Sequence, residues 1–262
     1  MRRAAQKGKT MTTGSIPVLA ALVFMGIPSL WAQCTVGDMK GDFATQPQGT
    51  LNAGPFAGPF AATGVIHFDG AGKFTGVATS SFNGTVIYPF FAEGNYGVTP
   101  DCLVTILETT LRIGFEGYMS TSKNEVTLVQ PDDGAITTNT LRRIQMPGGC
   151  SNASLNGVWT FQANGDNIAT TARVSQFARI TFDGNGTFRG NTAGSIEGVF
   201  SRSIITGTVQ VFPDCTFLWK YTDQSGTGTL LWGTFLGTGD QFIMIYSVDG
   251  LVITGTGRQG AS

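Results

Sequence analysis

Apolar and polar residues alternate with a period of two along much of the chain. In one such segment Ile180 and Phe182 point to one side while Arg179 and Thr181 point to the other, as in a half-buried strand. Segments of this kind, separated by Gly-rich turns, predict eight strands near residues 157–163, 171–182, 186–196, 203–211, 215–222, 228–236, 240–247 and 250–257. No stretch of 12 residues has helical periodicity, so the pattern predicts an all-β protein.

The turns and strands occur twice. Residues Phe68-Asp-Gly-Ala-Gly-Lys-Phe74 recur as Phe182-Asp-Gly-Asn-Gly-Thr-Phe188, and Pro100-Asp-Cys102 recurs as Pro213-Asp-Cys215. Four further matches keep an offset of 116 residues: Cys34 with Cys150, Gly41 with Gly157, Asp133-Gly134 with Asp249-Gly250, and Arg142 with Arg258. Landmarks in one order at a nearly constant offset predict a tandem duplication with units at 33–146 and 150–262.

Each unit has about 110 residues and eight expected strands, a layout typical of an antiparallel barrel or sandwich. A barrel is favoured because closure removes the sheet edges, and weakly charged edges promote aggregation. We therefore expect two tandem antiparallel eight-stranded β-barrels.

Residues 1–32 are typical of a secretory signal peptide. Four basic residues precede the apolar run 16–27, and Ala32 offers a small residue for cleavage. The run is shorter than the roughly 20 residues that span a bilayer, so no stable membrane insertion is expected after cleavage, with a retained anchor as the alternative. A lipid anchor on Cys34 is disfavoured because Gln33 stands where such a signal has a small residue. The mature protein is expected to be secreted, either periplasmic or extracellular.

Charge restricts the expected partners. Only 13% of the 262 residues are charged, and 41% are hydrophobic. Four of the 16 basic residues lie in the signal, which leaves 12 against 17 acidic residues and a net charge near −5. The remaining basic residues are scattered, whereas nucleic-acid binding needs clustered Lys and Arg, so no nucleic acid is expected as a partner. The pattern does not predict the oligomeric state.

Each unit has one cysteine at its start and one after Pro-Asp, which predicts one disulfide per unit. The pairs Cys34–Cys102 and Cys150–Cys215 enclose loops of similar length, and any other pairing would make the two copies unlike. In an oxidising compartment each bridge would stabilise its unit by roughly 4 kcal/mol on the loop-entropy model. A zinc site is the alternative, although the chain has no Cys-x-x-Cys and a single histidine. No metal or cofactor is expected.

Aromatic residues of the second copy are the main indication of a site. Phe217, Trp219 and Tyr221 alternate along one strand, and Trp232 on the next strand is expected beside them. These side chains, with Trp159, either fill the barrel, as in other small barrels, or line a cavity for an apolar or sugar ligand.

The first copy has other residues at these places. Val104, Ile106 and Glu108 match the three alternating aromatic residues, so a pocket in this copy should differ. Glu93, Glu108 and Glu116 lie on expected strands, and a carboxylate that pointed inward could serve as an acid or base. The second copy has no acid at the places of Glu93 and Glu116, so any catalysis by these groups would be confined to one copy.

The other polar candidates have structural explanations. His67 is expected to face solvent because its neighbours on both sides point the other way. Asp69 and Asp183 lie in Phe-Asp-Gly-x-Gly turns that predict tight hairpins, with calcium binding as the alternative. Asp101 and Asp214 precede the second cysteine of each unit and are expected to accept hydrogen bonds from local backbone amides.

Two positions in each unit resemble the calycin superfamily, which includes lipocalins and avidins. A Gly-x-aromatic motif stands near the start of each unit, at Gly41-Asp-Phe43 and Gly157-Val-Trp159, and an arginine stands near its end, Arg142 and Arg258. In lipocalins such a Trp and Arg pack together at the closed end of an eight-stranded barrel, so the resemblance implies this contact here. The first copy departs by having Phe for Trp. The Phe-Asp-Gly-x-Gly and Asp-Cys signatures also look like those of uncharacterised secreted bacterial proteins, which implies fold and compartment but no activity.

The sequence thus predicts an exported, non-enzymatic binding protein for a small apolar or carbohydrate-like ligand or a partner surface, with the better pocket in the second copy. The candidate ligand-binding residues are Trp159, Phe217, Trp219, Tyr221 and Trp232, and no catalytic residue is assigned. Pro-aromatic segments at 54–60 and 88–91 could plug a barrel end or bind a partner. One alternative is a cyclase or isomerase on a barrel that resembles allene oxide cyclase. The other is a structural envelope or matrix protein with filled barrels.

Overall fold

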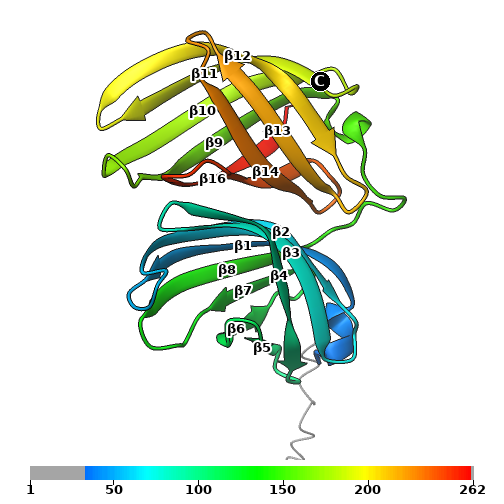
Figure 1. Cartoon of the computed structure of the whole chain (residues 1–262). Helices are drawn as coiled ribbons and strands as arrows, with labels where there is room; N and C mark the ends of the chain where they lie inside the picture. The colour runs from blue at the N-terminus through cyan, green and yellow to red at the C-terminus, as the bar shows by residue number, and fades with distance from the viewer. Residues whose placement is uncertain (1–32, 261–262) are drawn as a thin grey trace, which may run out of the picture. The chain divides into compact units, whose positions relative to one another are not determined.

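The computed structural model describes residues 33–260, and the predicted signal peptide at 1–32 lies outside them. The described chain forms two closed antiparallel barrels of eight strands each, one per predicted repeat (Figure 1). A short 3-10 helix precedes each barrel, η1 (Val36–Met39) in the first and η2 (Asn152–Leu155) in the second. The expected tandem of antiparallel barrels is therefore confirmed. Within residues 33–260, no helix has the length and apolar character needed to cross a membrane.

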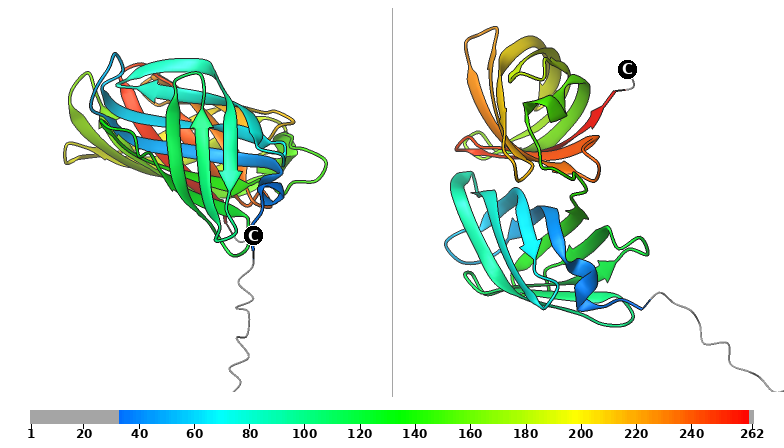
Figure 2. Two further views of the ribbon diagram at one scale, coloured as in Figure 1. Left: turned by 90° about the horizontal axis from the view of Figure 1, so that it is seen from below. Right: turned by 90° about the vertical axis from the view of Figure 1, so that its right-hand side faces the viewer.

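The strands follow each other around each barrel in chain order, and the first pairs with the last to close the ring (Figure 2). The first barrel consists of β1 (Gly41–Leu51), β2 (Gly58–Phe68), β3 (Lys73–Phe82), β4 (Thr85–Val98), β5 (Leu103–Glu108), β6 (Ile113–Met119), β7 (Glu125–Val129) and β8 (Ala135–Arg143). The second consists of β9 (Gly157–Asn167), β10 (Ala172–Phe182), β11 (Thr187–Ile196), β12 (Val199–Val211), β13 (Thr216–Asp223), β14 (Gly228–Leu236), β15 (Gln241–Tyr246) and β16 (Leu251–Gln259). All eight strands expected in the second copy are present, with ends that differ by at most four residues.

Side chains alternate between the barrel interior and the outer face along the strands. The clearest examples are β5 and β13, which occupy the same place in their barrels. The inward residues of β5 are Val104, Ile106 and Glu108, and those of β13 are Phe217, Trp219 and Tyr221. The two barrels therefore place very different side chains at matching inward positions.

Each barrel has the predicted disulfide at one end. Cys34 bonds to Cys102 and Cys150 bonds to Cys215, with sequence separations of 68 and 65 residues. Each bridge joins a cysteine two residues before the short helix to the turn between the fourth and fifth strands of its barrel. Both pairings expected from the duplication are confirmed.

The aspartates before the second cysteines differ between the copies. Asp214 accepts a hydrogen bond from the backbone N–H of Thr216 at 3.0 Å, as expected. Asp101 instead accepts one from the hydroxyl of Thr99. Both carboxylates therefore serve the turn that presents the cysteine.

The aromatic residue at the closed end of the first barrel does contact an arginine, but the residue is Arg143 and not the expected Arg142. The guanidinium carbon of Arg143 lies 4.4 Å from the centroid of the Phe43 ring, and its nitrogens donate to backbone carbonyls around η1. Arg142 points to the opposite face and pairs with Glu125 at 2.8 Å. A shift of one residue along a strand reverses the face, so the offset between the repeats cannot identify the inward arginine.

The second barrel has no arginine in this contact. Gln259 holds the place that corresponds to Arg143 and donates to the carbonyl of Asn156 at 3.0 Å. Arg258 is exposed, so it does not make the contact that the resemblance implies. The indole N–H of Trp159 instead donates to the carbonyl of Leu155 at 2.8 Å, which ties the ring to η2.

The two barrels belong to one compact unit and contact each other through outward-facing residues. An apolar cluster from β2, β14, β15 and β16 consists of Ala61, Trp232, Ile245 and Val252. Next to it, the backbone N–H of Gly250 donates to the carbonyl of Gly84 at 2.7 Å. Residues that face away from both interiors are therefore buried between the barrels.

The repeated Phe-Asp-Gly-x-Gly segments form the predicted hairpin turns. In each copy the aspartate Oδ1 accepts two backbone N–H groups of its own turn at 2.7–3.0 Å. The glycines of the second copy have φ of +74° and +107°, a region in which residues with a Cβ are strained. The aspartate carboxylate thus accepts hydrogen bonds from its own turn, as expected if the motif forms a tight hairpin.

A threonine hydroxyl distinguishes the two turns and leads to a first prediction. The Thr187 hydroxyl donates to Asp183 at 2.7 Å, and this bond, with the turn amides, lowers the pKa of Asp183 to about 2. In the first copy Lys73 replaces the threonine, and backbone N–H groups lower the pKa of Asp69. A depressed carboxyl pKa stabilises the fold above the usual value of 3.8, and this contribution is lost as the pH falls towards 2.

We therefore predict that Thr187→Ala raises the pKa of Asp183. The stability that the Asp183 carboxylate contributes is then smaller in the variant, and as the pH falls it is fully lost at a higher pH than in the wild type. Asp69 serves as the internal control and should titrate at the same pH in both proteins. NMR titration of the carboxyl carbons measures both sites. An unchanged titration midpoint of Asp183 in the variant would show that the Thr187 hydroxyl does not lower the pKa of this carboxyl group.

Candidate binding site

Most of the aromatic residues predicted to bind a ligand lie in the packed core of the second barrel. Trp159, Phe217 and Trp219 are each at most 1% exposed. Ring contacts with centroids 5.0–6.3 Å apart join them to five phenylalanines, Phe161, Phe182, Phe188, Phe235 and Phe242. Rings thus fill the half of the barrel next to the disulfide, as in the barrel-filling alternative.

Tyr221 lies closer to the other end of the second barrel and lines a cavity of about 310 Å³. There the hydroxyl of Tyr246 donates to Gln176 Oε1, and Gln176 Nε2 donates to Thr192 Oγ1 at 2.6 Å. Burial, and after it the neighbouring Tyr221, raises the pKa of Tyr246 well above its usual value. The phenol therefore stays protonated and remains a donor, and this chain of hydrogen bonds places polar groups on part of the cavity wall.

Trp232 does not join the other aromatic residues. Leu231 pairs with Trp219 and shares its inward direction, so the next residue on β14 points outward. The Trp232 ring stacks on Tyr88 of the first barrel, with centroids 4.1 Å apart, and on Phe212 at 5.8 Å. Its place is in the contact between the barrels.

The first barrel holds a mostly apolar cavity of about 100 Å³. Small side chains on β2, β3 and β4 form part of its wall, among them Ala62, Ala78 and Ala92. Ile106 and Phe115, on β5 and β6, form another part. The disulfide end of the same barrel is packed with apolar side chains, so the cavity occupies the other half.

Smaller side chains at matching positions give this cavity its apolar wall, whereas the second barrel has a ring or a polar group there. Ile106 stands where the second barrel has Trp219, and Ala62 stands where it has Gln176. The sequence holds this signal, because the offset of the repeats aligns these pairs. The signal lies in the volumes of side chains at matching inward positions of the two copies. The aromatic residues alone indicate the packed half of the second barrel instead.

One buried carboxylate lines the cavity. Glu108 is 7% exposed, and its two oxygens accept the backbone N–H groups of Thr110 at 2.7 Å and Leu111 at 2.6 Å. Glu93 and Glu116, the other candidate acids of this copy, are exposed on the outer face. The structure therefore brings a single member of the predicted set to the cavity.

Two pairs of neutral polar side chains around this cavity are joined by hydrogen bonds. Thr45 Oγ1 donates to Asn139 Oδ1 at 2.9 Å, and Thr137 Oγ1 donates to Gln130 Oε1 at 2.6 Å. These bonds satisfy much of the polar surface of β1, β8 and the turn before β8. Glu108 thus remains the one charged side chain among the residues that line the cavity.

His67 lies on the outer face of the first barrel, as its place in the alternation predicts. Its Nδ1 is 2.7 Å from Asp42 Oδ1, and both side chains are more than half exposed. The pair is separated from the interior by the barrel wall. It takes no part in either cavity.

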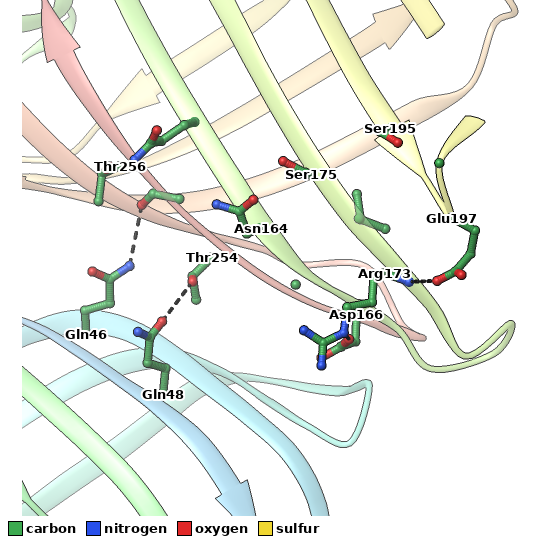
Figure 3. A pocket seen from close by; sticks show the side chains of 15 residues that line it. Gln46, Gln48, Asn164, Asp166, Arg173, Ser175, Ser195, Glu197, Thr254 and Thr256 are labelled. Carbon is green, nitrogen blue, oxygen red and sulfur yellow. Dashed lines mark hydrogen bonds and ion pairs between the residues drawn. The ribbon is translucent and has the colours of Figure 1, made fainter. Parts of the chain in front are cut away.

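A wider polar groove of about 760 Å³ runs between β1 and the outer face of β9, β10 and β16 (Figure 3). Across the groove Thr254 Oγ1 donates to Gln48 Oε1 at 3.1 Å. On one wall Arg173 Nε lies 3.6 Å from Asp166 Oδ1. Several of these polar groups thus bond to one another. The groove is therefore a weaker candidate for a small ligand than the cavity inside the first barrel.

The chain matches no protein-family model and no curated protein sequence. Three solved structures cover most of it. A DUF3598-family protein of unknown function from Nostoc punctiforme is 11% identical, with 87% of this chain and 100% of that chain covered and a TM-score of 0.26. Kievitone hydratase from Nectria haematococca is 8% identical, with 87% and 93% covered and a TM-score of 0.26. Transferrin binding protein B from serogroup B Neisseria meningitidis is 8% identical, with 85% and 77% covered and a TM-score of 0.27.

Likenesses this remote carry no argument about function.

The position of Trp232 leads to a second prediction. Trp232→Ala removes a ring that is 8% exposed and stacked on two others, so we expect it to lower the free energy of unfolding by about 3 kcal/mol. Phe177→Ala is the matched control, because Phe177 also points outward from the second barrel but is 60% exposed. Its effect should stay within about 0.5 kcal/mol. Equally small losses in denaturant unfolding would refute a stabilising role for the stacked rings.

Proposed function

We propose that the protein is an exported binding protein that holds a small apolar ligand in the cavity of the first barrel. The observation that carries this proposal is the mostly apolar cavity of about 100 Å³, lined by small and aromatic side chains. An engineered apolar cavity of about 150 Å³ in another protein stays dry and binds benzene. A ligand with one ring or a short alkyl chain therefore suits this volume.

Phenylalanine rings at the end of the first barrel that lies away from the disulfide support the proposal. Phe60, Phe82 and Phe90 line the cavity, and the Phe82 ring lies 4.8 Å from that of Phe60 and 6.1 Å from that of Phe90. Phe56 adds a further ring 4.7 Å from Phe82. The Pro-aromatic segments predicted at 54–60 and 88–91 thus contribute rings to the mouth, which protect the interior from water and leave it suited to an apolar guest.

The set of lining residues favours binding over catalysis. A cyclase or isomerase would need polar groups placed around the reacting atoms, and general acid–base chemistry needs a proton donor or acceptor within hydrogen-bond reach. Glu108 is the single titratable side chain that lines the cavity, so no second titratable group stands beside it to complete an acid–base pair. A purely structural role would be served best by a filled interior, as in the disulfide half of the second barrel.

The disulfides support the exported location. Disulfides persist in oxidising compartments and are rare in the cytosol. Each barrel has one, and all four cysteines of the chain are used. This agrees with the secretory signal expected at residues 1–32.

A cavity-filling variant tests the proposal. Toluene should bind the wild-type protein, and Ala62→Phe should weaken that binding at least about tenfold, a loss of about 1.4 kcal/mol, because the new ring occupies the place of the ligand. Thr105→Phe is the matched control, since Thr105 is exposed on the outer face of β5. It should leave the affinity unchanged. Isothermal titration calorimetry measures all three proteins, and toluene that bound none of them, or all three equally, would refute the proposed cavity.

A further inference from the structure

The Glu108 carboxylate in the first-barrel cavity accepts fewer hydrogen bonds than it could. Glu108 ends strand β5 on its inward side, and its Oε1 and Oε2 accept one backbone N–H each, from Thr110 and Leu111. Both distances are short, 2.7 and 2.6 Å, as in charge-assisted hydrogen bonds. An ionised carboxylate can accept about four hydrogen bonds, so about half of its capacity is unused.

No basic side chain of the described chain forms an ion pair with Glu108. The ion pairs within residues 33–260 are His67–Asp42, Lys123–Asp38, Arg142–Glu125 and Arg173–Asp166, and none of them includes Glu108. A charge buried without a partner is costly, and proteins normally pair such groups with an opposite charge. The cavity thus combines an apolar wall with a negative charge that has no cation.

Capping the turn after β5 does not explain why the carboxylate is buried. In the second barrel the matching turn, after β13, is capped by Asp223, whose Oδ1 accepts the N–H groups of Ser225 and Thr227, both at 2.9 Å. Asp223 is partly exposed and remains solvated. The second barrel therefore caps the matching turn without burying a charge. Turn capping alone does not require Glu108 to be buried, so we attribute its burial to the cavity.

We infer that the ligand of this cavity is a small amine with an apolar body, whose ammonium group pairs with Glu108. The inference rests on the proposed function and specifies the chemistry of the guest. An ammonium group has three donors and can use the free acceptor positions of the carboxylate, while the body contacts the alanine and phenylalanine walls. The net charge near −5 that remains without the signal segment also favours the approach of a cation.

Three probes of nearly equal size test the inference on the wild-type protein. Benzylamine, benzyl alcohol and benzoate share one ring and carry a positive charge, no charge and a negative charge at neutral pH. We expect benzylamine to bind at least about tenfold more tightly than benzyl alcohol, because both can donate a hydrogen bond to Glu108 but only the ammonium group also forms an ion pair with it. Benzoate should bind most weakly because its charge repels that of Glu108.

The variant Glu108→Gln locates the effect. It should reduce the affinity for benzylamine to that for benzyl alcohol and should relieve the penalty on benzoate. Thr105→Phe, on the outer face, should leave the order of the three probes unchanged. If the Gln variant does not fold, which circular dichroism would show, the wild-type series alone decides.

The outcomes separate this inference from the proposal on which it rests. If benzyl alcohol and benzylamine bind the wild type equally, and Ala62→Phe abolishes both, the cavity binds apolar molecules but the inferred amine specificity is wrong. If none of the three probes binds, the proposed binding function itself is contradicted. A preference for benzylamine that persists in Glu108→Gln would place the recognition elsewhere and overturn the inference.

Discussion

The interior of a closed eight-stranded barrel has a nearly fixed width, so its emptiness depends on the volumes of the inward side chains. Both barrels of this chain obey that constraint with the same strand order and the same disulfide. They differ in what β5 and β13 place inside. Phe217 and Trp219 fill the disulfide half of one barrel, whereas Val104 and Ile106 are smaller and an apolar cavity lies beside Ile106 in the other. Cavity and packed core are therefore two outcomes of one scaffold.

The contact between the barrels uses the opposite set of positions. Outward residues such as Ala61 and Trp232 are buried there, while the inward residues remain devoted to each interior. Since neighbouring positions on a strand face opposite sides, the two tasks are separated residue by residue. A protein built this way can change a cavity without disturbing the contact, which is one reason why duplicated barrels can diverge in their interiors.

The period-two pattern and the repeat predicted the strands of the second copy, the hairpin turns and the disulfides, because each depends on local spacing or on symmetry between copies. Features that depend on the face of a strand were harder to predict. Arg143 takes the contact expected of Arg142, and Trp232 faces the other barrel, because a shift of one position reverses direction. The role of Glu108 depends on the side chains that surround it from other strands, which no single segment of the sequence reveals.

The cavity and the carboxylate both lower the stability of the first barrel, and they lie at the same place. At about 24 cal/mol per Å³, an unfilled volume of about 100 Å³ corresponds to roughly 2 kcal/mol of lost stability. Burying Glu108 without a cation adds a further cost. The second barrel places Trp219 where the first has Ile106 and caps the matching turn with the partly exposed Asp223. A cavity and a buried carboxylate that coincide at one site are the pattern expected where function rather than stability determines the residues.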